Sequence, residues 1–181
     1  MESVDSRAGT RAEYLRRPDL GRRLSEASRS RLQALESRAH ISLVVGDGLS
    51  AVAVEMNAVP VLAALGPRIE AAGWSVSPVI VALQARVALG DEIGQVLGAR
   101  AVVMLIGERP GLSASDSLGA YITFAPEIGL PDSRRNCISS IRDGGLAPAD
   151  AAAQIAALLA RMMEQGTSGV TLEASEMPRL P

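Results

Sequence analysis

The apolar positions of the chain alternate between short continuous runs and longer stretches with helical spacing, and this alternation predicts the secondary structure. Residues 41–45 and 101–106 are uninterrupted aliphatic runs, typical of strands that are buried on both faces. Between them, apolar residues recur every three to four positions, as in amphipathic helices. We expect strands at 41–45, 75–83, 101–106, 119–124 and 136–141, with a last short one at 169–172. We expect helices at 51–65, 85–97 and 148–163.

Strands that alternate with helices indicate an α/β fold. We predict a Rossmann-like, three-layer domain with a mostly parallel sheet covered by helices on both faces. In such sheets ligands bind beyond the carboxyl ends of the strands. Two glycine-rich segments, 46–50 and 107–112, each follow a predicted strand, so both should lie at that edge.

The first 39 residues have a different character from the rest. Residues 1–12 resemble a flexible tail. For 20–39 we predict a polar helix with a thin apolar stripe, which would bury little against its own domain. We therefore divide the chain into a tail and helical arm, 1–39, and an α/β domain, 40–181. The arm carries nine arginines against six acidic residues, whereas the rest carries nine against fourteen. A basic arm on an acidic body favours contact with a partner subunit.

Composition excludes several classes of protein. The net charge of −2 gives no general attraction to nucleic acid, and aromatic residues are too few for the base-stacking surfaces of single-strand binders. No apolar run reaches the roughly 20 residues of a membrane span without interruption. The single cysteine, Cys137, and the single histidine, His40, give neither a disulfide framework nor a metal site. The N-terminus has no secretory signal pattern, so we expect a cytoplasmic protein.

The segment 46–51 matches the pattern G-x-G-x-x-A between a strand and a helix. One interpretation is a diphosphate at the helix N-terminus, as in nicotinamide-dependent oxidoreductases. Asp47 inside the turn would repel a diphosphate, and no acidic residue stands at the end of the next strand. The other interpretation is a turn required only for tight packing of strand against helix.

Two further residues are candidates for chemistry at the ligand edge. Glu108 could accept hydrogen bonds from a ligand, or Arg109 could neutralise it as a surface pair. Cys137 could be a nucleophile only with a base, and His40 precedes the first strand of the body, at the opposite edge. We therefore expect a buried, unreactive cysteine that could still touch a ligand, no catalytic residues, and a binding subunit rather than a self-sufficient enzyme.

Five segments, in order, resemble the small subunit of ethanolamine ammonia-lyase. They are R-R-P-D-L-G-R-R-L-S at 16–25, V-V-G-D-G-L-S-A at 44–51, A-R-V-A-L-G-D-E-I-G at 85–94, L-I-G-E-R-P-G-L-S-A-S-D-S-L-G-A-Y at 105–121, and R-N-C-I-S-S-I-R at 135–142. This resemblance implies a Rossmann-like α/β fold and a cofactor, adenosylcobalamin, held between this chain and a large subunit whose barrel binds ethanolamine. Three cobalamin-contact positions of the family match Val87, Glu108 and Cys137. We expect Glu108 and Cys137 on loops at the ligand edge and Val87 at the start of a helix.

The resemblance also implies a function for the whole assembly. The reaction is a radical deamination of ethanolamine to acetaldehyde and ammonia within a hetero-oligomer, and this chain needs its large subunit for activity. Many family members carry a longer N-terminal extension that can direct them to a bacterial microcompartment. Only 15 residues precede Arg16 here, which argues against such targeting. The alternatives are a nicotinamide-dependent oxidoreductase and a non-catalytic scaffold subunit.

Overall fold

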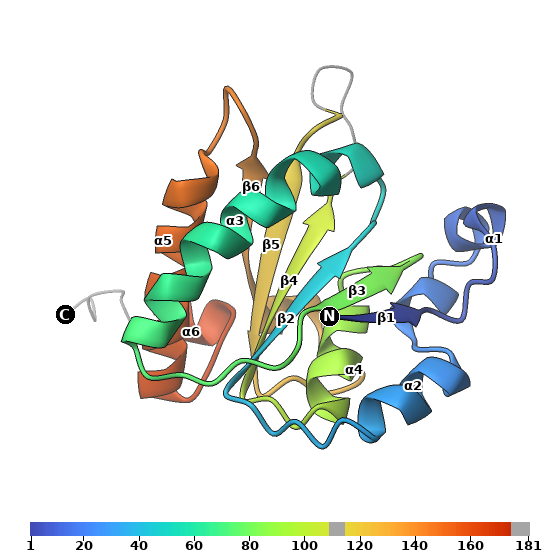
Figure 1. Cartoon of the computed structure of the whole chain (residues 1–181), viewed down its shortest axis with the longest axis horizontal. Coiled ribbons are helices and arrows are strands. Elements are labelled where there is room, and N and C mark those ends of the chain that lie inside the picture. Colours follow the sequence, from blue (N-terminus) through green and yellow to red (C-terminus); the bar gives the residue numbers. More distant parts are fainter. Residues whose placement is uncertain (109–114, 175–181) are drawn as a thin grey trace.

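One six-stranded sheet organises the computed structural model, which describes residues 1–108 and 115–174 (Figure 1). The strands lie in the order β1-β3-β2-β4-β5-β6. Their bounds are β1 Glu2–Asp5, β2 Ile41–Gly46, β3 Ile80–Leu83, β4 Ala101–Gly107, β5 Leu118–Phe124 and β6 Arg135–Ile141. The helices are α1 Arg11–Arg16, α2 Glu26–Gln33, α3 Ala51–Ala71, α4 Leu89–Val96, α5 Pro148–Gln165 and α6 Val170–Ala174, with 3-10 turns at Leu20–Arg22 and Asp132–Arg134.

The α/β class is confirmed, but the sheet is mixed, and the prediction of a mostly parallel Rossmann-like sheet is not confirmed. β1, β3, β2 and β4 are parallel, whereas β5 pairs antiparallel with β4 and with β6. The reason lies in the connection from β4 to β5, which spans only residues 108–117. A parallel return needs a crossover of a dozen or more residues, so this short connection produces an antiparallel pair.

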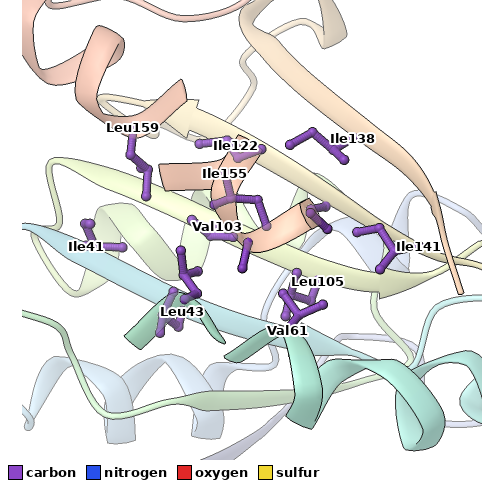
Figure 2. Close-up of a cluster of buried hydrophobic side chains, with 14 of the residues drawn as sticks. Ile41, Leu43, Val61, Val103, Leu105, Ile122, Ile138, Ile141, Ile155 and Leu159 are labelled. Carbon is purple, nitrogen blue, oxygen red and sulfur yellow. The ribbon is translucent and has the colours of Figure 1, made fainter. Parts of the chain in front are cut away.

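Helices cover both faces of the sheet, which explains the unbroken apolar runs of β2 and β4. Leu43 and Leu105 face one core cluster, with α3 and α5, and Figure 2 shows this cluster around Val103 and Ile155. Val44 and its neighbours in β4 face the other cluster, with α4 and α2. Because alternate residues of each strand enter different cores, every position of β2 and β4 is buried.

The first 39 residues are more integrated than predicted. Residues 2–5 are not a flexible tail but the edge strand β1, which pairs with β3. The segment predicted as one polar helix contains a 3-10 turn and the shorter α2, and Leu24 and Leu32 are 1% exposed against α4. The apolar stripe is thin, but it closes one side of the core. The proposed boundary at residue 40 stays a prediction.

Other element predictions were wrong in detail. The predicted strand at 169–172 is helix α6, because Gly169, at φ +72°, turns the chain against the backbone of residues 133–134. The strand predicted at 75–83 is confined to β3, and the helix predicted at 85–97 begins only at Leu89. Helix α3 continues past Gly66-Pro67 to Ala71.

Helix α3 is also the one described helix that is long and apolar enough to cross a membrane by length and composition. Glu55 and two prolines, Pro60 and Pro67, lie within it. Val61 and Leu65 on its inner side are completely buried in the core shared with α5. These contacts account for the apolar residues on its inner side. Val52, Met56 and Val59 on the other side of the helix are 50%, 53% and 70% exposed.

Candidate functional site

The carboxyl ends of the parallel strands meet at one edge of the sheet, as predicted. Gly46 ends β2, Leu83 ends β3 and Gly107 ends β4, and the pairing of Gly107 with Leu118 and of Leu118 with Ile141 brings the start of β5 and the end of β6 to the same edge. Five separate segments of the chain therefore supply side chains to one region.

Two adjoining hollows lie on the face of the sheet that carries α4. Helix α4 covers β2 and β4 on this face but leaves Tyr121 of β5 and Cys137 of β6 accessible. The first hollow has a volume of about 300 Å³ and the second about 470 Å³. Both are lined by Arg86, Val87 and Tyr121, so they form one continuous recess.

The recess brings the three predicted residues together. Val87 lines both hollows, Cys137 lines the first and Glu108 lines the second. Val87 lies in the loop just before α4, and Glu108 directly follows β4. Cys137, however, is inside β6 rather than on a loop, and it is exposed rather than buried. Its strand lies at the edge of the sheet, and α4 contacts only the start of this strand, at Arg135, and leaves Cys137 accessible. The sequence pattern could not reveal this exposure.

Glu108 is held in a fixed position by its neighbours. The hydroxyl of Ser117 donates to Glu108 Oε2 at 2.5 Å, and the backbone N–H of Ser140 donates to the same oxygen at 3.3 Å. Ser140 has φ +60° and lies where β6 has one residue more than β5, a bulge that takes its N–H out of the ladder. Gly119 leaves space for the Glu108 carboxylate, since a Cβ at position 119 would lie 2.7 Å from Glu108 Oε1. Arg109, the other partner considered for Glu108, lies outside the described residues.

Cys137 and Tyr121 form the floor of the first hollow. They face each other directly in the register of β5 and β6, and their side chains are hydrogen bonded. Although Cys137 is exposed as a residue, burial of its sulfur by neighbouring atoms raises the pKa of the thiol. The hydrogen bond from Tyr121 lowers this pKa, and the negative charge of Glu108 raises it. Burial also raises the pKa of the Tyr121 phenol, so both groups are neutral at pH 7.

We expect the Cys137 thiol to react with iodoacetamide at pH 8 more slowly than the same cysteine in the urea-unfolded chain. A raised pKa leaves less thiolate, the reactive form, and moves the midpoint of the rate profile to higher pH. Glu108→Gln should speed the reaction, because it removes a charge that opposes ionisation. Equal rates in the folded and unfolded chains would contradict the raised pKa.

The polar side chains of the G-x-G-x-x-A turn form hydrogen bonds with the protein's own backbone. Asp47 accepts hydrogen bonds from the backbone N–H groups of Gln84 and Ala85, both at 2.9 Å. Ser50 caps α3 by accepting from the N–H of Ala53. A Cβ on Gly48 would lie 2.3 Å from the carbonyl oxygen of Gly107. These contacts favour the packing interpretation of the turn and fix the loop that presents Val87.

A buried ion pair joins the two walls of the recess. Asp91 of α4 and Arg135 of β6 have side chains only 3% and 4% exposed, and Arg135 Nε donates to Asp91 at 3.0 Å. Arg135 also donates to the carbonyl oxygen of Leu130 at 3.0 Å. Burial raises the pKa of the Asp91 carboxyl, and the hydrogen bond and charge of Arg135 oppose that shift. The pair therefore ties α4, which follows Val87, to β6, which carries Cys137.

Sequence reasoning missed several residues of the recess. Tyr121, Arg22 and Arg86 all line the first hollow. Tyr121 lay within a predicted strand. Its position opposite Cys137 depends on the register of β5 and β6, which the sequence pattern does not predict. Among residues 1–108 and 115–174, no three His, Cys, Asp or Glu side chains gather as metal ligands. His40 contacts Ser75 at the opposite edge of the sheet, which excludes a Cys137–His40 pair.

Comparison with protein families gives a match over nearly the whole chain. The family model described as "Ethanolamine ammonia-lyase light chain" matches residues 1–173. That range includes every strand and all three residues predicted to contact a cofactor.

Curated proteins give the same similarity. An ethanolamine ammonia-lyase small subunit from Ralstonia nicotianae is 49% identical over 98% of this chain and 67% of its own length. Those from Bradyrhizobium diazoefficiens and Pseudomonas syringae pv. tomato are 51% and 50% identical, over 97% and 94% of this chain and 68% and 61% of their own lengths. The chain thus spans about two thirds of the length of these relatives.

Proposed function

Because this chain belongs to the ethanolamine ammonia-lyase light-chain family, we propose that it is the small subunit of a lyase that converts ethanolamine to acetaldehyde and ammonia. It would act within a hetero-oligomer and need a large subunit for activity. The cytoplasm, with or without a microcompartment, is the proposed location.

The proposed role of this chain is to hold adenosylcobalamin against the large subunit. The single observation that carries it is the meeting of Val87, Glu108 and Cys137, from three distant segments, in one open recess. When bound, this cofactor supplies a cobalt–carbon bond whose homolysis starts radical chemistry on the substrate.

The residues of the recess fit such a ligand. A corrinoid has a broad apolar ring with amide groups at its rim, and the recess offers both apolar surface and hydrogen-bonding groups. Val87 is half-buried, and the Cys137 thiol is neutral. Arg86 lines both hollows, and its buried Nε has no hydrogen-bond partner among the described residues. An unpaired donor on a side chain that lines a recess is suited to a polar ligand, since a ligand partner removes its cost.

Each residue has a distinct task under this proposal. The Glu108 carboxylate accepts hydrogen bonds from amide N–H groups, and Ser117 and Ser140 hold it in place to do so. Val87 and Cys137 give van der Waals contact and exclude water from that part of the recess. Tyr121 keeps the Cys137 sulfur in position through their hydrogen bond.

We expect Gly119→Ala to weaken cobalamin binding to the two-subunit complex without unfolding the chain. The new Cβ would push away the Glu108 carboxylate, which is the flexible end of its side chain. The small gain of about 0.5–1 kcal/mol from replacing a strand glycine should offset much of the lost Ser117 hydrogen bond. Cofactor titration and thermal unfolding would measure the two effects.

The control is Gly66→Ala, in α3, where a Cβ meets no atom within 4 Å. This variant should raise stability by about 0.5–1 kcal/mol and leave cofactor affinity unchanged. If Gly119→Ala bound cobalamin as the wild type does, the geometry of Glu108 would not matter for binding.

The function itself is tested by mixing this chain with a cognate large subunit, adenosylcobalamin and ethanolamine, and omitting each component in turn. Release of ammonia and acetaldehyde only from the complete mixture would support the proposal. A folded complex that binds cobalamin but does not turn over ethanolamine would point to another substrate. Absence of any complex would overturn the assignment as a subunit.

A further inference from the structure

Three arginines line the first hollow, and they differ in whether a carboxylate pairs with them. Arg135 is paired within the protein: it donates hydrogen bonds to the carboxylates of Asp91 and Asp132 and to the carbonyl oxygen of Leu130. Arg22 and Arg86 make no ion pair with any residue that the structure describes. The hollow therefore has two cationic side chains whose charge is not matched by a protein carboxylate.

Arg86 is directed into this position by the N-terminal segment. Its Nη2 donates to the carbonyl oxygen of Tyr14 at 3.1 Å, and its guanidinium lies 4.2 Å from the centre of the Tyr14 ring. These contacts fix the plane of the guanidinium, yet its Nε is buried and has no acceptor among the described residues. A buried donor without a partner is unfavourable, so a movement of the side chain that brings this N–H to a ligand oxygen in the hollow would be stabilising.

The surrounding charges favour an anion at this place. The carboxylate of Asp132 lines the hollow but is paired with Arg135. Tyr121 and Cys137 are neutral, and Glu108 lies in the neighbouring hollow. Ethanolamine, as a cation, would be repelled by two free guanidinium groups. An anionic oxygen with flat, paired acceptor positions, such as a phosphate, matches a guanidinium best.

We propose that Arg86, with Arg22 at the rim, binds the phosphodiester in the nucleotide arm of cobalamin. This inference rests on the proposed function. The amide groups at the edge of the corrin are neutral, so the phosphodiester is the group on that ligand that two unpaired arginines would recognise. The cofactor would then be held at two points, by Glu108 through its amides and by Arg86 through its phosphate.

The test compares two corrinoids on the complex of this chain with its large subunit. Cyanocobalamin carries the phosphodiester, and cyanocobinamide lacks the nucleotide arm. Arg86→Gln should weaken cyanocobalamin by about tenfold or more and change cyanocobinamide by less than about twofold. Arg22→Gln should act in the same direction with a smaller effect, since this side chain is exposed. Absorbance titration gives both affinities without turnover.

One further variant tests the charge of Arg86, and another serves as a control. Arg86→Lys keeps the charge but loses the Nε donor, and should bind cyanocobalamin with intermediate affinity. Arg16→Gln, an exposed arginine of α1 that does not line either hollow, should match the wild type. Because Arg22 makes no ion pair with a described residue, Arg22→Gln remains informative even if Arg86→Gln disturbs the segment around Tyr14.

Three outcomes would overturn the proposal. Equal weakening of both corrinoids by Arg86→Gln and none by Arg22→Gln would mean that Arg86 acts only by supporting the fold. Unchanged affinity for both corrinoids, with weaker binding of inorganic phosphate, would assign the arginines to free phosphate. Failure of the wild-type complex to bind either corrinoid would remove the cofactor assignment itself, a pattern distinct from the first two.

Discussion

Glu92→Ala is expected to lower the free energy of unfolding by about 3 kcal/mol. Glu92 is 1% exposed and accepts from Arg23 Nε at 2.9 Å, Arg29 Nη1 at 2.7 Å and the backbone N–H of Leu24 at 3.0 Å. Breaking a buried pair costs about 3–5 kcal/mol. The two arginine side chains are 37% and 31% exposed, so water can solvate them after the change, and the effect should lie at the low end.

Urea unfolding followed by circular dichroism would measure this effect. Glu92→Gln, which keeps the size of the side chain but not its charge, would separate packing from ion pairing. Glu55→Ala, on the exposed side of α3, is the matched control and should stay within about 0.5 kcal/mol of the wild type. If Glu92→Ala were as mild as this control, apolar contacts alone would hold the N-terminal segment on the body.

Glu108→Ala is expected to weaken cobalamin binding to the two-subunit complex by about 10- to 150-fold. A hydrogen bond to a charged group contributes about 1.5–3 kcal/mol, and every 1.4 kcal/mol is about tenfold in affinity. The alanine variant loses this acceptor and also leaves the Ser117 hydroxyl and the Ser140 N–H without their partner. Titration of the complex with cyanocobalamin would give the change in Kd.

The controls for this second change address charge and fold. Glu108→Gln keeps one oxygen acceptor and should bind with intermediate affinity. Glu127→Ala removes an exposed carboxylate that lines neither hollow, and should have no effect on binding. Wild-type affinity in Glu108→Ala would favour the alternative in which this chain is only a scaffold for the assembly.

The sequence predicted best those elements that are buried on both faces, because full burial requires an apolar residue at almost every position. Strands β2 and β4 are covered on both faces, and their unbroken apolar runs could have few other meanings. Strand β1 is a four-residue edge strand with the sequence ESVD, of which only Val4 is buried. It becomes a strand because β3 offers it a free edge, and that fact is not contained in its own residues.

The site was predictable to a similar degree. The ligand edge followed from strand ends alone, and family resemblance supplied Val87, Glu108 and Cys137. The resemblance did not show that Cys137 lies within a strand beside Tyr121, because that contact depends on the antiparallel register of β5 and β6. Arg22 was equally hidden, since its segment was predicted to bury little against its own domain. Arg86 lay within the helix predicted at 85–97, and its contact with Tyr14 could not be foreseen.

The place of β1 in the sheet also constrains the order in which the chain can fold. Glu2 pairs with Ile80, so during synthesis β1 has no partner in this sheet until the whole of α3 and β3 has followed. Closing so long a loop has an entropic cost that local contacts do not repay, and such pairings form late. Until then the edge of β3 is open to a β1 strand from another molecule. We therefore expect a nascent or heated chain to exchange strands through this edge. The hydrogen bonds of buried Glu92 with Arg23, Leu24 and Arg29 favour closure within one chain.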